Sequence, residues 1–195
     1  MSEVIKIANC SGFYGDNLSI AKKMVEGGPI DVLTGDYLAE LTMTILYNQK
    51  MKRGENLGYV GTFLKQFRDV AKLCNDQKIK IVSNAGGLNP ASMAAEVENI
   101  IKELNLDLKV AYIDGDDLMP RLDELSSSGE KLKNIDKNND LFSYEKKPLT
   151  ANAYLGAWGI KEALDNGADV VICPRVTDAA VVIGPAAWKF NWSRN

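Results

Sequence analysis

Histidine is absent from all 195 residues of the sequence. The absence excludes Ser-His-Asp and Cys-His catalysis within this chain, because both need an imidazole to accept the proton of the nucleophile. It also removes the commonest metal ligand in proteins. Any acid or base that the chain supplies must therefore be an aspartate, glutamate, lysine, tyrosine or cysteine side chain.

Cysteine is scarce, and Cys10, Cys74 and Cys173 show no spacing typical of a metal site or a disulfide framework. An odd number of widely separated thiols suits a reducing compartment. Because no histidine is available to activate a thiol, we expect Cys10 and Cys173 to pack in the core and not to act as nucleophiles.

Long apolar runs are also missing, since none approaches the ~20 residues that a membrane span requires. The N-terminus, Met1-Ser-Glu-Val-Ile-Lys-Ile7, has no basic stretch followed by a cleavable apolar segment. We therefore expect a cytoplasmic protein without a membrane partner. The net charge of −3 and the pI near 5.1 argue against nucleic acid as a partner, because nucleic-acid binding needs a basic face.

The residues that are present give a globular composition, with 46% hydrophobic and 25% charged residues. A chain of this length can bury a substantial core. We expect residues 1–195 to form a single α/β domain. Residues 126–147 are rich in Ser, Lys, Asn, Asp and Glu without a clear period, which predicts a mobile surface excursion from that domain.

Short apolar runs alternate with stretches of helical period along the chain. The runs predict strands at 4–8, 30–33, 80–82, 109–113 and 169–173. The periodic stretches predict helices at 18–26, 38–46, 60–74, 90–104, 155–166 and 179–188, with a break possible at Gly184-Pro185. Alternating strands and helices predict a mainly parallel sheet with helices on both faces, a Rossmann-like or flavodoxin-like three-layer sandwich. A partial barrel is the alternative.

Polar or glycine-rich clusters follow every predicted strand, and the carboxyl ends of parallel strands meet at one edge of a sheet. Ligands of such proteins bind at that edge, so we expect a small-molecule site there. Neither a GxGxxG fingerprint nor a Walker loop is present. The expected ligand-binding residues lie in the loops after the first, third and fifth strands: Asn9, Ser11, Gly12, Asn84, Gly86, Gly87, Asn89 and Arg175.

Two of these loops suggest anion binding. Gly86-Gly87 lets the backbone approach a ligand closely, and the helix starting at Pro90 would offer free amides to a phosphate, carboxylate or oxyanion. Arg175 could clamp a carboxylate or phosphate. Helix capping by Asn89 and an Arg175–Asp178 structural pair are the plainer interpretations.

The candidate catalytic residues are Asp36, Asp116 and Asp178, because each lies just past a strand end. Crowding or burial could raise the pKa of one of them enough for it to act as a general base. Together with Asp114 and Asp117 they could instead bind Mg²⁺ through oxygen ligands. Helix capping and turn closure remain the alternative for each. No residue is assigned as a metal ligand.

Several ordered blocks resemble one known family. They cover most of the chain outside residues 126–147, and they are Asn9-Cys-Ser-Gly-Phe-Tyr-Gly-Asp16, Gly27-Gly-Pro-Ile-Asp-Val-Leu-Thr-Gly-Asp-Tyr-Leu-Ala-Glu-Leu-Thr42, Ser83-Asn-Ala-Gly-Gly-Leu-Asn-Pro90, Asp114-Gly-Asp-Asp117, Thr150-Ala-Asn-Ala-Tyr-Leu-Gly156, Arg175-Val-Thr-Asp178 and Gly184-Pro-Ala-Ala-Trp188. On these blocks the chain resembles the acyclic terpene utilisation (AtuA-like) family.

The resemblance implies a role in the breakdown of acyclic isoprenoids such as citronellol and geraniol, which proceeds through CoA thioesters. It implies a lyase or hydratase-like step on a branched acyl-CoA or related carboxylate, without catalytic residues to carry over. Family members are usually much longer, so the chain would correspond to their N-terminal part. The family pattern has glycine where Pro174 stands and histidine where Lys189 stands.

Two hypotheses follow. The first is an enzyme, or the N-terminal half of one, with a CoA thioester as substrate and Mg²⁺ as an optional cofactor. The second is a non-catalytic binding or assembly subunit that needs a partner chain, because Trp188, Phe190 and Trp192 near the C-terminus could form an interface. We expect either a homo-oligomer or pairing with a C-terminal partner chain.

Overall fold

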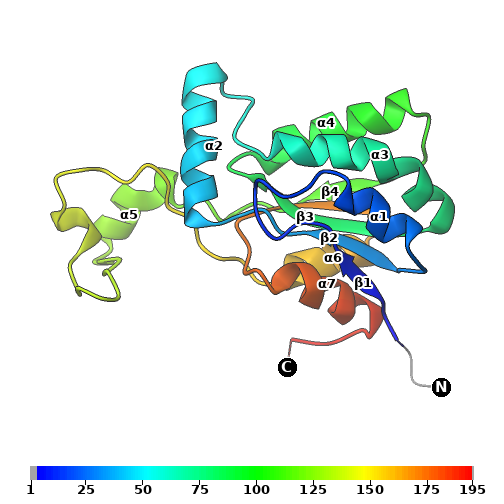
Figure 1. The fold of residues 1–195 in the computed structure, drawn as a ribbon. Coiled ribbons are helices and arrows are strands. Elements are labelled where there is room, and N and C mark those ends of the chain that lie inside the picture. The colour runs from blue at the N-terminus through cyan, green and yellow to red at the C-terminus, as the bar shows by residue number, and fades with distance from the viewer. Residues whose placement is uncertain (1–3, 195) are drawn as a thin grey trace.

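Five parallel strands form the centre of the computed structural model, which describes residues 4–194 (Figure 1). The strand order across the sheet is β1-β2-β3-β5-β4. The strands are β1 (Ile7–Asn9), β2 (Val32–Gly35), β3 (Lys80–Gly87), β4 (Val110–Tyr112) and β5 (Val170–Pro174). The sheet is open, with β1 and β4 at its edges, so the three-layer prediction is confirmed and the barrel alternative is wrong.

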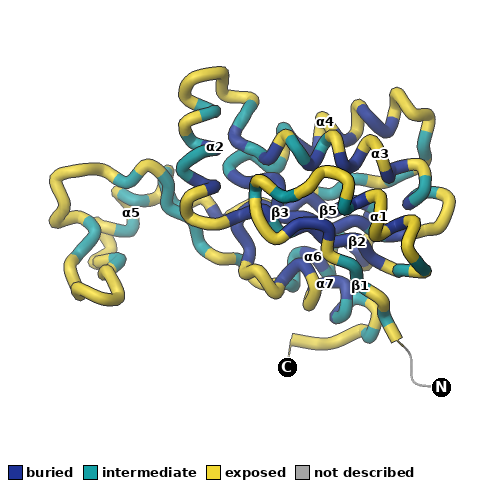
Figure 2. Tube along the Cα trace, in the orientation of Figure 1, coloured by how far each residue is buried: buried dark blue, intermediate teal, exposed yellow. Residues whose placement is uncertain are grey.

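The inner strands are buried on both faces (Figure 2). In β5, Val170 and Ile172 pack into the core on one face, and Val171 and Cys173 pack into the core on the other. Strands covered on both faces are apolar at successive positions, not at alternate ones. That requirement explains why the sequence shows short continuous apolar runs.

Helices cover the two faces according to the direction of the crossovers. The chain passes from β1 to β2, β3 and β4 in one direction across the sheet, then returns to place β5 between β3 and β4. Because crossovers between parallel strands are right-handed, the return places its helix on the opposite face. One layer accordingly holds α1 (Ile20–Glu26), α3 (Gly61–Gln77) and α4 (Pro90–Glu103), and the other holds α6 (Trp158–Asp165) and α7 (Ala180–Lys189).

The predicted helices are present with ends shifted by at most three residues, except that α2 continues to Arg53, seven residues past its predicted end. The apolar stripe of α3 is buried, including Phe63, Phe67 and Cys74. The possible break at Gly184-Pro185 does not occur, since α7 continues through both residues. Gly184 allows α6 and α7 to pack closely, because a Cβ there would lie 2.5 Å from the Ile160 Cγ2 atom. No helix among residues 4–194 is long and apolar enough to cross a membrane.

Two segments lie outside the three layers. Helix α2 (Glu40–Arg53) stands beside the carboxyl ends of the strands, and residues 117–150 form an arm that projects from the body (Figure 1). The arm contains the short helices η1 (Met119–Arg121), α5 (Leu122–Ser127) and η2 (Leu141–Ser143), and none of its residues is buried. A segment without a buried side chain is consistent with the predicted surface excursion, whose mobility stays a prediction.

Candidate functional site at the carboxyl ends of the strands

The candidate site is centred on the adjacent carboxyl ends of β3 and β5, which are paired as far as Gly87 and Pro174. After β3 the chain enters α4 on one face of the sheet, and after β5 it enters α7 on the other. Neighbouring strands whose following helices diverge in this way form the switch point of an open α/β sheet, where such folds bind ligands. The side chains gathered there come from β3, from the loops after β2, β4 and β5, from the start of α2 and from the stretch before α6.

Asp36 links the ends of β2 and β3. Its Oδ1 atom accepts a hydrogen bond of 2.5 Å from the Asn84 side-chain amide, and the Asn84 Oδ1 atom accepts one of 2.8 Å from the Tyr37 backbone N–H. Burial of the half-buried carboxyl raises the pKa of Asp36, and the negative charge of Asp178 raises it further. The site thus contains a carboxyl group that takes up a proton more readily than an ordinary aspartate.

Asp116 performs a similar linking role after β4. Its Oδ2 atom accepts hydrogen bonds from the Asn152 side-chain amide at 2.8 Å and from the Arg175 backbone N–H at 3.1 Å. Asp116 is only 4% exposed, and this burial is the largest cause of its raised pKa. Asp116 therefore ties the two ends of the projecting arm to the end of β5.

Arg175 is enclosed by its neighbours and is itself only 4% exposed. Its Nη1 atom donates to the Leu38 carbonyl at 2.9 Å and to Asp178 Oδ1 at 3.3 Å, while Nη2 lies 3.6 Å from Glu40 Oε1. The guanidinium carbon lies 4.1 Å from the ring centroid of Tyr154, whose hydroxyl donates to Glu40. The expected Arg175–Asp178 pair is present as part of a larger polar cluster.

The third strand was predicted to end at residue 82, but β3 continues to Gly87, so Gly86 and Gly87 are its last two residues and not part of a loop. A Cβ on Gly86 would lie 2.6 Å from the Cys173 carbonyl oxygen. Gly87 has φ +54°, and a Cβ there would lie 2.4 Å from Leu46 Cδ1 and 2.8 Å from the Gly58 carbonyl oxygen. These close approaches require glycine at both positions. They provide a structural reason for the glycine pair that does not involve a ligand.

The start of α4 is also occupied. Asn89 caps the helix by accepting from the Ser92 backbone N–H at 3.2 Å, and its amide donates to the carbonyl oxygens of Glu55 and Leu57. The loop between α2 and α3 therefore lies against this helix terminus. The capping interpretation of Asn89 is confirmed, and anion binding at this terminus stays a prediction.

The loop after β1 lies beside Asp36, whose backbone N–H donates to the Ser11 carbonyl at 3.0 Å. Within this loop the Asn9 amide donates to the same carbonyl at 2.8 Å, and Ser11 Oγ donates to the Phe13 carbonyl at 2.9 Å. The Gly12 N–H bonds to Asp16 Oδ2 at 3.0 Å, and the space where a Gly12 Cβ would lie is open. Ligand contact by Asn9, Ser11 and Gly12 remains a prediction.

The structure thus brings five predicted site residues into one polar cluster: Asp36, Asn84, Asp116, Arg175 and Asp178. Of the other predicted residues, Gly86 and Gly87 are required by backbone packing, and Asn89 caps α4. Sequence reasoning missed three members of the cluster, Glu40, Asn152 and Tyr154. Glu40 is the first residue of α2 and belongs to the block Gly27–Thr42, and the other two belong to the block Thr150–Gly156. Membership of these blocks, on which the family resemblance rests, was the signal that could have identified them.

The remaining candidates show no sign of a nucleophile or a metal centre. Burial raises the pKa of Cys10 to about 11 and raises the pKa of Cys173 further, so both remain thiols at neutral pH. Within residues 4–194 no three His, Cys, Asp or Glu side chains gather in a way that could hold an ion. The aspartates proposed as Mg²⁺ ligands therefore do not form one ligand set.

Comparison with known proteins agrees with the resemblance. The model of the acyclic terpene utilisation family protein AtuA matches residues 5–195, which is nearly the whole chain. No curated protein and no solved structure matches the chain significantly. On the extent of the family match, the chain belongs to the acyclic terpene utilisation family.

Proposed function

We propose that the chain provides the proton-transfer half of an enzyme that acts on a branched acyl-CoA or related carboxylate during acyclic isoprenoid breakdown. The observation that supports this proposal is the environment of Asp36. Its carboxyl group is half-buried, has a raised pKa and lies at the switch point beside Arg175. A carboxylate whose pKa is raised is a stronger general base than an ordinary aspartate.

The proposed chemistry is proton transfer next to a thioester carbonyl, as a lyase or hydratase-like reaction needs. The Asp36 carboxylate would take a proton from the carbon beside the carbonyl, and the negative charge would move onto the carbonyl oxygen. The positive charge of Arg175 would stabilise that oxygen, and the Asn84 amide would hold the Asp36 carboxyl in place. Asp116 acts as a positioning residue in this scheme, because its acceptor oxygen is occupied by Asn152 and the Arg175 backbone.

Solvent deuterium exchange tests the proposal without knowledge of the complete reaction. The chain is incubated in D₂O with a branched acyl-CoA such as isovaleryl-CoA, and deuterium incorporation next to the carbonyl is followed by NMR. Catalysed exchange should fall by about 10²–10⁴-fold in Asp36→Asn and stay unchanged in Asp107→Asn, an exposed aspartate before β4. Undiminished exchange in Asp36→Asn would contradict the assignment.

A second candidate, a non-catalytic binding or assembly subunit, is favoured by the enclosure of Arg175. A guanidinium that contacts Leu38, Glu40, Tyr154 and Asp178 has little remaining freedom to clamp a ligand. Calorimetry with CoA and isovaleryl-CoA separates the two candidates. Thioester binding without catalysed exchange, or binding that needs a partner chain, would favour the second.

A further inference from the structure

The open edge of the sheet at β4 carries unused backbone hydrogen-bonding groups. In the parallel register with β5, Val110 is paired with Val170 and Tyr112 with Ile172. The Lys109 carbonyl and the Ile113 N–H bond to β5, so the N–H and C=O groups of Val110 and Tyr112 point away from the sheet. No hydrogen bond to them exists within residues 4–194. An edge of this kind is a template for a further strand.

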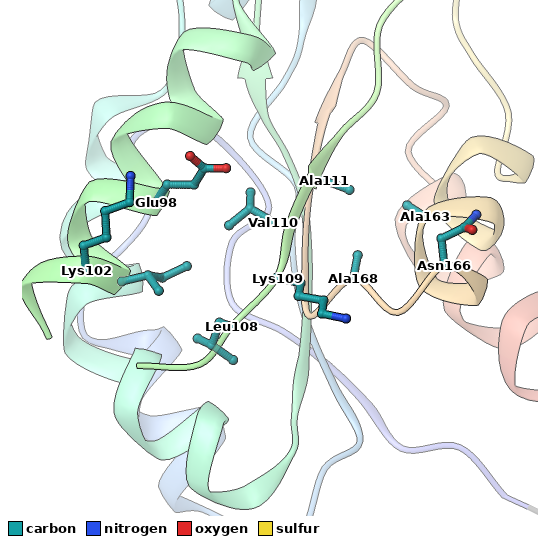
Figure 3. Close-up of a pocket in the computed structure, with 10 residues that line it drawn as sticks. Glu98, Lys102, Leu108, Lys109, Val110, Ala111, Ala163, Asn166 and Ala168 are labelled. Atoms are coloured by element: carbon teal, nitrogen blue, oxygen red, sulfur yellow. The ribbon is translucent and has the colours of Figure 1, made fainter. Parts of the chain in front are cut away.

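The same edge is bordered by a hollow of about 550 Å³ (Figure 3). Helix α4 flanks β4 on one side of the strand and α6 on the other, and the hollow is lined by side chains of all three elements. Its apolar lining includes Leu108 and Val110. A strand added to β4 would therefore enter a slot that already has helices above and below it.

We propose that the occupant of this slot is β4 of a second copy, in a two-fold symmetric dimer. Antiparallel pairing centred on Ala111 places Val110 of each copy opposite Tyr112 of the other. Both residues point their backbone groups outward, so each of the two pairs exchanges two N–H···O=C bonds. This two-fold symmetric register therefore satisfies the free edge groups of both residues.

Charge on α4 favours the same arrangement. Glu98 and Lys102 lie one helical turn apart, both line the hollow, and neither forms an ion pair within the described part of the chain. A two-fold axis perpendicular to the sheet sets α4 of the two copies side by side and antiparallel. Glu98 of each copy then faces Lys102 of the other, which makes the surface complementary to itself.

Proline scanning of the two sheet edges tests the interface by sedimentation velocity over a range of protein concentrations. Tyr112→Pro removes an N–H that the single chain does not use, so it should abolish the dimer without unfolding the monomer. Ile7→Pro is the matched control, since the Ile7 N–H points outward on the opposite edge strand β1. Circular dichroism confirms that both variants fold.

Charge exchange provides a second, independent test. Glu98→Lys should weaken dimerisation by roughly tenfold or more, because two pairs of like charges then face each other. The double change Glu98→Lys with Lys102→Glu should restore it. Glu96→Lys, a change on the face of α4 toward α3, should leave the dimer unaffected. A wild-type monomer at all concentrations, or a dimer broken by Ile7→Pro and not by Tyr112→Pro, would overturn the proposal.

Discussion

The end of β3 and the loop after β5 were both predicted to contact a ligand, but their residues have different roles in the structure. At the end of β3, Gly86 and Gly87 are required by close backbone packing, and Asn89, just past the strand, bonds to three backbone groups. After β5, Arg175 and Asp178 join a cluster that includes the half-buried Asp36 and the half-exposed Tyr154. A position at a strand end therefore does not by itself make a ligand residue. The difference is whether the hydrogen-bonding and packing capacity of the residue is already used.

A side chain placed at Gly87 is expected to change the stability of the protein most. Gly87→Ala should destabilise the protein by roughly 2–5 kcal/mol, because the new Cβ combines left-handed backbone strain with overlap onto Leu46. Chemical denaturation measures the change. Gly12→Ala, in the loop after β1 where a Cβ meets open space, should stay within about 0.5 kcal/mol of wild type. Equal stability of the two variants would mean that the end of β3 is not fixed by packing.

Removal of the α4 cap should have a smaller effect. Asn89→Ala loses one capping bond and two bonds to the α2–α3 loop, which predicts a loss of about 1–2 kcal/mol. The measurement is the same denaturation series, with Asn48→Ala on the surface of α2 as the control. If Asn89 instead binds a ligand and contributes little to the fold, stability will be retained and ligand affinity will fall.

Some features of the fold and the site could be predicted from the sequence alone, and others could not. The parallel three-layer fold was predictable, because uninterrupted apolar runs and helical stripes such as Phe63-Phe67 depend on local pattern. The gathering of Asp36, Asp116 and Asp178 at one edge followed from topology. The contact between Tyr154 and Glu40 was not predictable, because it joins residues 114 positions apart. The strand order, with β5 inserted before β4, also depends on tertiary packing that no local pattern encodes.

The pH dependence of stability can be compared between wild type and Asp116→Asn, in which the buried carboxyl beside Arg175 is replaced by a neutral amide. The raised pKa of Asp116 means that the folded state favours its protonated form. This stabilisation is complete below the unfolded pKa of about 3.9 and is lost as pH rises through the folded pKa. Asp116→Asn keeps an acceptor oxygen for Asn152 and Arg175 without the charge. Its thermal stability relative to wild type should therefore improve from pH 4 to pH 7, and a decline would contradict the assigned burial effect.

The smallest expected effect concerns the exposed part of the β5 cluster. Tyr154→Phe keeps the ring over Arg175 and loses only the hydroxyl bond to the exposed Glu40 carboxylate. Denaturation should show a loss of about 0.5 kcal/mol or less, because solvent screens an exposed polar contact. A loss of stability as large as that of Asn89→Ala would mean that the Tyr154 hydroxyl contributes as much to the fold as the Asn89 cap. The difference between the two regions would then not hold.

A site-resolved titration of Asp36 determines whether this carboxyl group has the raised pKa that the proposed proton transfer needs. Carboxyl ¹³C NMR follows each aspartate against pH, with Asp36→Asn used to assign its signal, before and after addition of isovaleryl-CoA. We predict that Asp36 titrates above the ordinary range of an aspartate side chain and that its titration shifts when the thioester binds. An ordinary aspartate titration at Asp36, unchanged by the bound thioester, would contradict the claim that this carboxyl group is the proton-transfer residue of the site.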